Sequence, residues 1–308
     1  MSLPKIMGLV GPTGIGKTAL ALLLADTCDI EIVSVDSRQV YRGMDIGTGK
    51  PSAAELSKVR HHLVDIVDPQ ETFSLAEFLD KAYLVIEDIH GRGKLPFLVG
   101  GTGQYFWALM ENWTVPRVAP DVSFRKRMEQ VVEADGADAL FSRLKQVDPD
   151  AADSLDIRNI RRVIRAMEIH HVTGVPWSKL QRRGSERFEY QVVGLTMDKP
   201  SLHERINDRI GVMIGRGWIR EVTDLLETGV TMSHSSMASV GYRDLGSYLS
   251  GDLALEEALE NIKRKTQRFA RRQYNWFRPD DSRINWVNAT NLSEASEIVR
   301  NIVAQFLR

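Results

Sequence analysis

The segment Gly11–Thr18 matches every fixed position of the phosphate-loop pattern G-x-x-x-x-G-K-[ST]. It lies between an apolar run, Ile6–Val10, and a helix-like run, Ala19–Ala25, which is the strand–loop–helix context that the pattern requires. Backbone N–H groups of such a loop converge on phosphate oxygens at a helix N-terminus, Lys17 adds positive charge, and the Thr18 hydroxyl group is placed to bind Mg²⁺. The segment therefore predicts a diphosphate-binding loop in an α/β fold. Its expected diphosphate-binding residues are Gly11, Pro12, Thr13, Gly14, Ile15, Gly16, Lys17 and Thr18.

The composition limits the classes of protein to which the chain can belong. Its 308 residues include 40 Lys and Arg against 41 Asp and Glu, so only local basic surface can attract a polyanion. The single cysteine, Cys28, excludes a disulfide framework, and the adjacent pairs His61–His62 and His170–His171 lack metal-ligand spacing. No apolar stretch approaches the roughly 20 residues of a membrane span, and the loop begins too early for a signal peptide. We expect a cytoplasmic protein with no membrane partner.

Alternating strand and helix patterns follow the loop. Three strand-like runs are Glu31–Val35, Leu63–Val67 and Pro96–Val99. Between the last two, a capping box at Ser74–Glu77 predicts a helix to about His90. This alternation predicts a parallel sheet flanked by helices, whose ligands bind beyond the carboxyl ends of the strands. Asp36 and the turn Gly100–Gly103 then lie beside the phosphate loop.

The pattern changes after Trp113, where prolines and helix-like segments replace the strands. The expected helices here span about 121–133, 137–146 and 154–170, and the next strand pattern spans 191–196. We therefore expect a helical insertion domain at 115–190 and a P-loop-type core formed by 1–114 and 191–308. In the second part of the core, we expect helices at 202–215, 218–227 and 256–277, a strand at 284–287 and a final helix to about 307.

The loop alone does not identify its ligand. The chain has no guanine-reading Asn-Lys-x-Asp element, and the run Pro96–Val99 ends in glycines and a threonine instead of a Walker B carboxylate. Asp65 is a substitute for that carboxylate, which keeps a small-molecule kinase open. Asp36 would stand beside bound phosphates, where a carboxylate requires a metal ion or a proton to accept. An Asp that follows a strand is also common as a turn or helix cap.

Several motifs resemble those of the tRNA dimethylallyltransferases, also called tRNA isopentenyltransferases. Besides the phosphate loop, the segments that carry the resemblance are residues 34–48, 99–103, 161–168, 202–209, 240–243 and 271–273. The resemblance covers nearly the whole chain. Because no Cys or His stands near the C-terminus, the chain is similar to the compact bacterial form and not to eukaryotic relatives with a zinc finger.

The resemblance implies a reaction. The family transfers a dimethylallyl group from dimethylallyl diphosphate to N6 of the adenosine directly 3′ of the anticodon, position 37, in tRNAs that read codons beginning with U. Because N6 is a poor nucleophile, this transfer needs a stabilised leaving group, alignment of N6 with the prenyl carbon and removal of a proton. The resemblance implies that Lys17, Arg209 and Thr18 with Mg²⁺ hold the diphosphate. It also implies that Asp36 accepts the proton and that Thr102 lies at the reacting centre.

The same resemblance implies contacts with the tRNA anticodon stem-loop. The expected tRNA-binding residues are Asp36, Ser37, Arg38, Gln39, Thr102, Arg158, Arg161, Arg162, Val163, Ile164, Arg165, Val240, Gly241, Tyr242 and Arg243. Ser37, Arg38 and Gln39 would contact the adenosine, which has to leave the base stack to react. Independently of the resemblance, the four arginines from 158 to 165 follow i, i+3, i+4, i+7, which predicts four guanidinium groups on one helix face.

A second basic cluster spans 263–273, with Tyr274, Trp276 and Phe277 beyond it. Such charge runs are also typical of solvated helix faces. Aromatic residues like these are also typical of a protein core. Without the resemblance, Arg209 is equally typical of a surface arginine, and Thr102 and Ser37 of loop caps.

Three other functions remain open from the residues. These are a small-molecule kinase, an adenylate isopentenyltransferase that acts on free nucleotides, and a nucleotide-switched RNA binder without turnover. The insertion and its basic residues argue against the free-nucleotide enzyme. Since the family usually acts as a monomer, we expect a monomer.

Overall fold

The computed structural model describes residues 3–180 and 182–308. The chain divides into two compact units, Met1–Met110 with Arg187–Arg308, and Glu111–Glu186. The sequence placed the corresponding boundaries at 114/115 and 190/191. We call the first part the core unit and the second part the helical unit.

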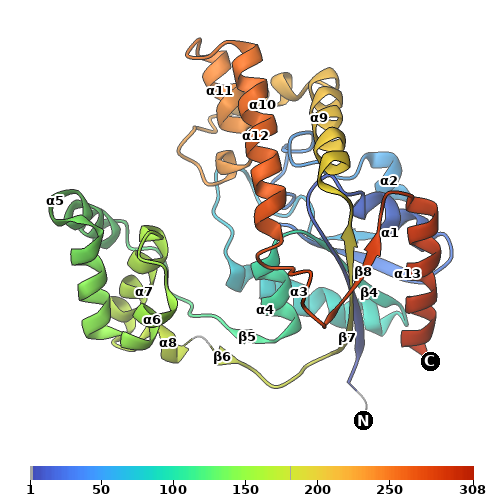
Figure 1. The fold of residues 1–308 in the computed structure, drawn as a ribbon, viewed down its shortest axis with the longest axis horizontal. Coiled ribbons are helices and arrows are strands. Elements are labelled where there is room, and N and C mark those ends of the chain that lie inside the picture. The colour runs from blue at the N-terminus through green and yellow to red at the C-terminus, as the bar shows by residue number, and fades with distance from the viewer. Residues whose placement is uncertain (1–2, 181) are drawn as a thin grey trace. The chain divides into compact units, whose positions relative to one another are not determined.

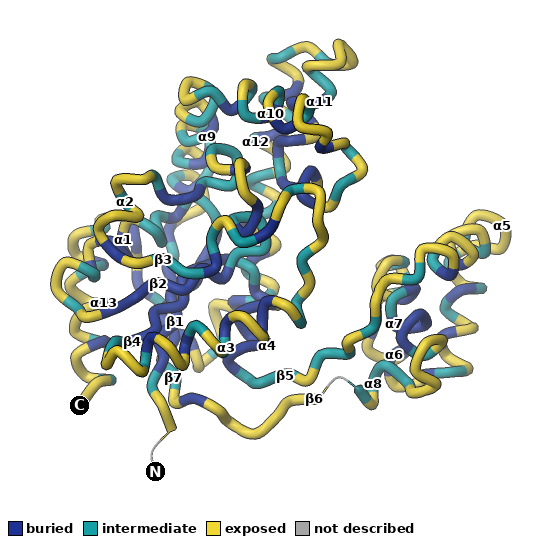
Figure 2. Tube along the Cα trace, turned by 180° about the vertical axis from the view of Figure 1, so that it is seen from behind, coloured by how far each residue is buried: buried dark blue, intermediate teal, exposed yellow. Residues whose placement is uncertain are grey.

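The core unit is built on a six-stranded parallel sheet with the order β3-β2-β4-β1-β7-β8. Its strands are β1 (Lys5–Val10), β2 (Ile30–Val35), β3 (His61–His62), β4 (Leu95–Gly100), β7 (Glu189–Thr196) and β8 (Ile284–Asn288). The interior strands β2 and β4 are buried along their whole length, which is the pattern of a sheet covered on both faces (Figure 2). The predicted α/β fold with a P-loop-type parallel sheet is confirmed.

Helices cover both faces of this sheet (Figure 1). Helices α1 (Lys17–Ala25) and α13 (Leu292–Leu307) pack together on one face, and α3 (Leu75–Gly91) and α4 (Gly103–Met110) on the other. Four further helices lie beyond the carboxyl ends of the strands: α9 (Lys199–Gly215), α10 (Trp218–Glu227), α11 (Tyr242–Leu249) and α12 (Leu255–Gln273). These four helices stand where a parallel sheet of this kind binds its ligands. None of the helices among the described residues has the length and apolarity needed to cross a bilayer.

The predicted strand Leu63–Val67 is wrong. In this region of the chain only His61–His62 pairs with β2, because Leu63 and Asp65 adopt left-handed backbone angles, with φ of 62° and 56°, that no continuous strand accommodates. The short strand is anchored by a bond of 2.7 Å between His62 Nε2 and the buried Glu31 carboxylate of β2.

Capping boxes mark the first residues of two helices in the core unit. Ser74 and Glu77 form the predicted capping box of α3, and a second one, Ser52 with Glu55, begins α2 (Ala53–Lys58), a helix that the sequence did not predict. Helix α11 was also not predicted, and a one-turn 3₁₀ helix, Ser236–Ala238, precedes it.

The helical unit contains α5 (Val122–Val147), α6 (Pro149–Ser154), α7 (Ile160–Thr173), α8 (Trp177–Leu180) and a short antiparallel pair, β5 (Trp113–Thr114) with β6 (Arg182–Arg183). Gly136, with φ 84° and ψ 171°, breaks α5 into two segments, as the expected helices at 121–133 and 137–146 require. The helix expected at 154–170 is confirmed from residue 160 as α7, but its start is wrong, because α6 ends at Ser154 and α7 begins after the Asn159 cap. Apolar residues of α5, α6 and α7 form a core of this unit's own.

Candidate active site

The phosphate loop joins β1 to α1 in a conformation that its glycines allow. Gly11, Gly14 and Gly16 have φ angles of 141°, 84° and 104°, which side chains with a Cβ rarely adopt. The Lys17 ammonium group folds back over the loop and donates to the carbonyl groups of Gly11 at 2.9 Å and Pro12 at 3.0 Å. The two carbonyl groups at the start of the loop therefore hold the Lys17 ammonium group against the loop.

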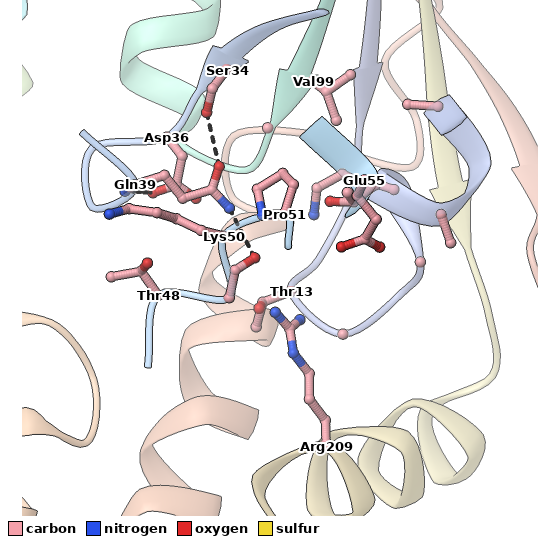
Figure 3. Close-up of a pocket in the computed structure, with 18 of the residues that line it drawn as sticks. Thr13, Ser34, Asp36, Gln39, Thr48, Lys50, Pro51, Glu55, Val99 and Arg209 are labelled. Carbon is pink, nitrogen blue, oxygen red and sulfur yellow. Dashed lines mark hydrogen bonds between the residues drawn. The ribbon is translucent and has the colours of Figure 1, made fainter. Parts of the chain in front are cut away.

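Two cavities of the core unit meet at this loop. The first, of about 490 Å³, is lined by Gly16, Lys17 and Thr18, and we call it the phosphate-loop cavity (Figure 3). The second, of about 450 Å³, is lined by Ser37, Thr102 and residues of α12, and we call it the turn cavity. The residues that line both cavities are Thr13, Gly14, Asp36, Thr48, Arg209 and Met213.

Asp36 follows β2, and its carboxylate caps a turn. It is also one of the six residues that line both cavities, which together we call the shared wall. Its Oδ1 accepts hydrogen bonds from the backbone N–H groups of Arg38 at 2.8 Å and Gln39 at 3.4 Å. Among residues 3–180 and 182–308, no donor is bonded to Oδ2. Oδ1 therefore caps the turn, as the alternative interpretation of Asp36 predicted. The same two hydrogen bonds fix the orientation of the whole carboxylate.

Lys17, Arg209 and Asp36 form a cluster of charges. Burial lowers the pKa of Lys17 to about 8, with Asp36 acting to raise it and Arg209 to lower it further. Burial also lowers the pKa of Arg209, again against the opposing effect of Asp36. Arg209 extends from α9 toward Thr13 of the loop and is half-buried, so it is not the exposed surface arginine that the spacing left open (Figure 3). Asp36 and Arg209 thus lie on the wall between the two cavities, and Lys17 lies beside them in the phosphate-loop cavity.

Thr102 and Ser37 join the carboxyl ends of two neighbouring strands. The Thr102 hydroxyl oxygen accepts a hydrogen bond from the Ser37 backbone N–H at 3.1 Å and lies 3.5 Å from the Ser37 hydroxyl group. The strands approach closely here, since a Cβ on Gly100 would lie 2.0 Å from the Val35 carbonyl oxygen. Both hydroxyl side chains line the turn cavity beside Asp36.

Arg38 and Gln39 point to different places. Arg38 lines the turn cavity, and its guanidinium group donates to the Ser235 carbonyl oxygen at 2.8 Å. Gln39 lines the phosphate-loop cavity, where it accepts from Ser34 at 3.0 Å and donates to the Gly49 carbonyl oxygen at 3.2 Å (Figure 3). Gln39 therefore braces the loop around Gly49 and, unlike Ser37 and Arg38, does not face the turn cavity.

Asp65, the carboxylate that kept a kinase open, lines neither cavity. It pairs with the buried ammonium group of Lys50, which also contacts Asp45 at 2.6 Å and the Tyr41 carbonyl oxygen. Its charge is neutralised by Lys50, which lies in the loop that follows β2. A Walker B role for this residue is therefore not supported by its position.

Of segment 240–243, which the resemblance implied in tRNA binding, one residue lines a cavity. Val240 lines the turn cavity, and Arg243 is exposed. Tyr242 is fully buried, and a Cβ on Gly241 would lie 2.2 Å from the Trp218 ring. The Tyr242 side chain and Gly241 thus hold this segment against α10.

Two polar side chains that hold loops of the core unit, the buried Gln273 and the half-buried Glu221, were not predicted. Gln273, at the end of α12, accepts from the Thr13 backbone N–H at 2.7 Å and donates to the Gly101 carbonyl oxygen at 2.9 Å. Glu221 of α10 accepts from the backbone N–H groups of Asp45, Ile46 and Gly47. Both contacts join residues more than 150 positions apart, so no local pattern announces them. The one signal for Gln273 was its place in the resembling segment 271–273.

In the helical unit, the expected face of four guanidinium groups is wrong. Arg158 precedes α7 and pairs with Asp156 at 2.8 Å, while Arg165 is half-buried and binds the fully buried Glu168 at 2.5 Å. Arg161 and Arg162 are exposed on α7. Val163 and Ile164 lie in the core of this unit, so their side chains pack inside it and cannot contact RNA.

Metal binding by side chains alone is not supported in the described part of the chain. No group of three or more His, Cys, Asp or Glu residues there is arranged to hold an ion. A divalent ion at the phosphate loop would need oxygen ligands from its substrate in addition to the Thr18 hydroxyl group, as Mg²⁺ commonly does.

Two family models match the chain. One described as "IPP transferase" matches residues 39–280, and one described as "Isopentenyl transferase" matches residues 4–69. Curated relatives match over most of their length. The tRNA dimethylallyltransferase of Roseiflexus sp. (strain RS-1) is 49% identical, covering 89% of this chain and 90% of the relative. That of Dehalococcoides mccartyi is 39% identical, covering 99% of this chain and 93% of the relative.

Solved structures show the same fold. The tRNA isopentenylpyrophosphate transferase of Bacillus halodurans has a TM-score of 0.73 at 39% identity, covering 98% of this chain and 96% of that one. A eukaryotic dimethylallyltransferase, solved acting on tRNA, has a TM-score of 0.82 at 28% identity, covering 99% of this chain and 79% of that one.

Proposed function

This chain belongs to the IPP transferase family, and from this premise we propose that it transfers a dimethylallyl group from dimethylallyl diphosphate to N6 of adenosine 37 in tRNA, with release of diphosphate. We propose that the acceptors are tRNAs reading codons that begin with U. The observation that carries the proposal is the position of Asp36 on the wall shared by the phosphate-loop cavity and the turn cavity.

The phosphate loop holds the leaving group in this proposal. As the bond between the prenyl C1 and its oxygen breaks, negative charge grows on the diphosphate. Lys17, Arg209 and the loop N–H groups stabilise that charge in a partly buried site, where such interactions are strong. Because a bound anion favours the ammonium form of Lys17, diphosphate binding raises its pKa above the value of about 8 in the free protein.

Asp36 accepts the N6 proton in this proposal. The two backbone bonds to Oδ1 orient the carboxylate without help from the substrate, which is the pre-organisation that a general base requires. The adenine enters the turn cavity, past Ser37 and Thr102, so that N6 meets the prenyl carbon at the shared wall. The new N6–C1 bond forms as the C1–O bond breaks, and the N6 proton passes to Asp36.

Mg²⁺ fits the loop as a partner of the substrate. The Thr18 hydroxyl group lines the phosphate-loop cavity next to Lys17, where a hard cation bound jointly to diphosphate oxygens would lie. When bound, the ion neutralises charge on the diphosphate and makes it a better leaving group. The protein's own contribution remains the orientation of the diphosphate by Lys17 and Arg209.

The helical unit supplies RNA-binding surface in this proposal. Arg161 and Arg162 are exposed and contact tRNA phosphates, whereas Arg165 serves the fold. Both cavities belong to the core unit of one chain, so a monomer contains the complete diphosphate site. We propose that it works as a monomer in the cytoplasm.

The test is transfer of label from radiolabelled dimethylallyl diphosphate to unmodified tRNA in the presence of Mg²⁺. The matched control is the same tRNA with guanosine at position 37, which has no N6 amino group. AMP as acceptor tests the free-nucleotide enzyme, and labelled ATP in place of the prenyl donor tests a kinase. Label confined to the adenosine-37 tRNA is the expected result; label that stays in the donor contradicts the proposal.

A further inference from the structure

Gln273 covers one end of the phosphate loop. Its side chain is only 5% exposed and links the third loop residue to the turn after β4. Oε1 accepts from the Thr13 N–H at 2.7 Å, and Nε2 donates to the Gly101 carbonyl oxygen at 2.9 Å. The partners fix the orientation of this amide, since a backbone N–H can only donate and a carbonyl oxygen can only accept.

The end of α12 packs tightly against the turn after β4, at Gly101 and Gly103. A Cβ on Gly101 would lie 2.0 Å from Gln273 Nε2, and a Cβ on Gly103 would lie 2.2 Å from the Cβ of Trp276. In addition, the Trp107 indole N–H donates to the Trp276 carbonyl oxygen at 2.9 Å. The end of α12 is thus pressed against the turn after β4, and Gln273 is held in place beside the loop.

The two ends of the loop consequently differ in what they offer an anion. Gly16, Lys17 and Thr18 line only the phosphate-loop cavity, close to the cationic groups. At the other end, the Thr13 N–H is already bonded to Gln273 and cannot donate to a phosphate. The Gln273 side chain lines the turn cavity, and the shared wall beside it carries the Asp36 carboxylate together with the Arg209 guanidinium group. One loop N–H group beside the turn cavity, that of Thr13, is therefore not available to a longer polyphosphate.

We propose that Gln273 is a specificity-determining residue that restricts the loop to diphosphates and rejects triphosphates such as ATP. This inference rests on the proposed function, because it assumes that the loop binds the diphosphate of a prenyl donor. A third phosphate at this end finds the Thr13 N–H already bonded to the Gln273 amide oxygen, and it lies near the Asp36 carboxylate. An uncharged prenyl chain has no such conflict at the same place.

The experiment measures binding of inorganic pyrophosphate, inorganic triphosphate and ATP by calorimetry, with Mg²⁺ and without tRNA. Three variants are compared with the unmodified protein. Gln273→Met keeps the size of the side chain but frees the Thr13 N–H. Gln273→Ala frees it and also opens space. Gln273→Glu retains an acceptor for Thr13 and serves as the matched control.

We expect the affinity ratio of triphosphate to pyrophosphate to rise at least about tenfold in Gln273→Met and Gln273→Ala, the size of one hydrogen bond to a charged group. In transfer assays, ATP should become a competitive inhibitor against dimethylallyl diphosphate in these two variants. Gln273→Glu should keep the original ratio or lower it. A loss of folding lowers both affinities together and does not produce this gain.

An unchanged ratio in Gln273→Met, or an equal gain in Gln273→Glu, would overturn the role of Gln273. The proposed function fails differently, since the unmodified protein would then bind no pyrophosphate at all. The two failures are therefore distinguishable in the same titrations.

Discussion

Tyr242 donates a hydrogen bond of 2.7 Å to Glu221, although neither residue lines the phosphate-loop cavity or the turn cavity. The Glu221 carboxylate also receives the N–H groups of Asp45 at 2.7 Å, Ile46 at 2.6 Å and Gly47 at 3.1 Å. Burial and the neighbouring Glu221 charge raise the pKa of Tyr242, which keeps it a donor at any physiological pH. This pair holds the segment whose continuation, through Thr48 and Gly49, reaches Arg209.

Removing Glu221 should therefore cost more than removing the Tyr242 hydroxyl group. We expect Glu221→Ala to lower the free energy of unfolding by about 2–4 kcal/mol, because three backbone donors lose a charged acceptor. Tyr242→Phe, the matched control, removes one bond and should cost about 1–2 kcal/mol. Urea denaturation measures both. Equal losses would show that Glu221 does not anchor the segment.

The lowered pKa of Lys17 predicts a pH dependence of diphosphate binding. The ammonium form binds the anion, and the free protein loses that proton as the pH rises through about 8. Affinity for pyrophosphate should then fall at higher pH. Lys17→Arg is the control, since its guanidinium group stays protonated and the ligand's own titration is the same for both proteins. The affinity ratio of the two proteins should shift toward Lys17→Arg between pH 7 and 9; a constant ratio contradicts the assignment.

Neighbouring arginines of α7 should behave in opposite ways. The double variant Arg161→Ala, Arg162→Ala should weaken tRNA binding and flatten its dependence on salt, because fewer counterions are released, while stability stays unchanged. Arg165→Ala should instead lower the free energy of unfolding of the helical unit by about 1–3 kcal/mol, since the buried Glu168 loses one of its two arginine partners. Filter binding at several salt concentrations and thermal melting separate the two effects. An unchanged salt slope in the double variant would make Arg161 and Arg162 ordinary solvated residues.

The sequence predicted those parts of the site that depend on local chemistry. The phosphate loop, the capping box at Ser74 and the break at Gly136 are each encoded within a few residues, and the structure has all three. The position of Asp36 next to the loop followed from the rule that parallel strands end at the same edge of a sheet.

The sequence did not predict features that depend on distant partners. Leu63–Val67 has strand composition, yet left-handed angles at Leu63 and Asp65 end the strand, and the Asp65–Lys50 pair that accompanies them joins two loops. The spacing predicted that Arg158 and Arg165 share one exposed helix face. Arg158 instead precedes α7, which begins at Ile160, and Arg165 binds the buried Glu168. Glu221 and Gln273 act through contacts across 170 to 260 positions, which no periodicity encodes.

The most direct test of the central claim is the rate of the chemical step in Asp36→Asn. The asparagine Oδ1 can still accept the N–H groups of Arg38 and Gln39, so the turn and the diphosphate site remain while the proton acceptor is lost. In single-turnover transfer to tRNA, we expect the rate to fall by about 10²–10⁴, with pyrophosphate affinity unchanged or slightly higher. A rate within about fivefold of the unmodified protein would contradict Asp36 as the group that removes the N6 proton.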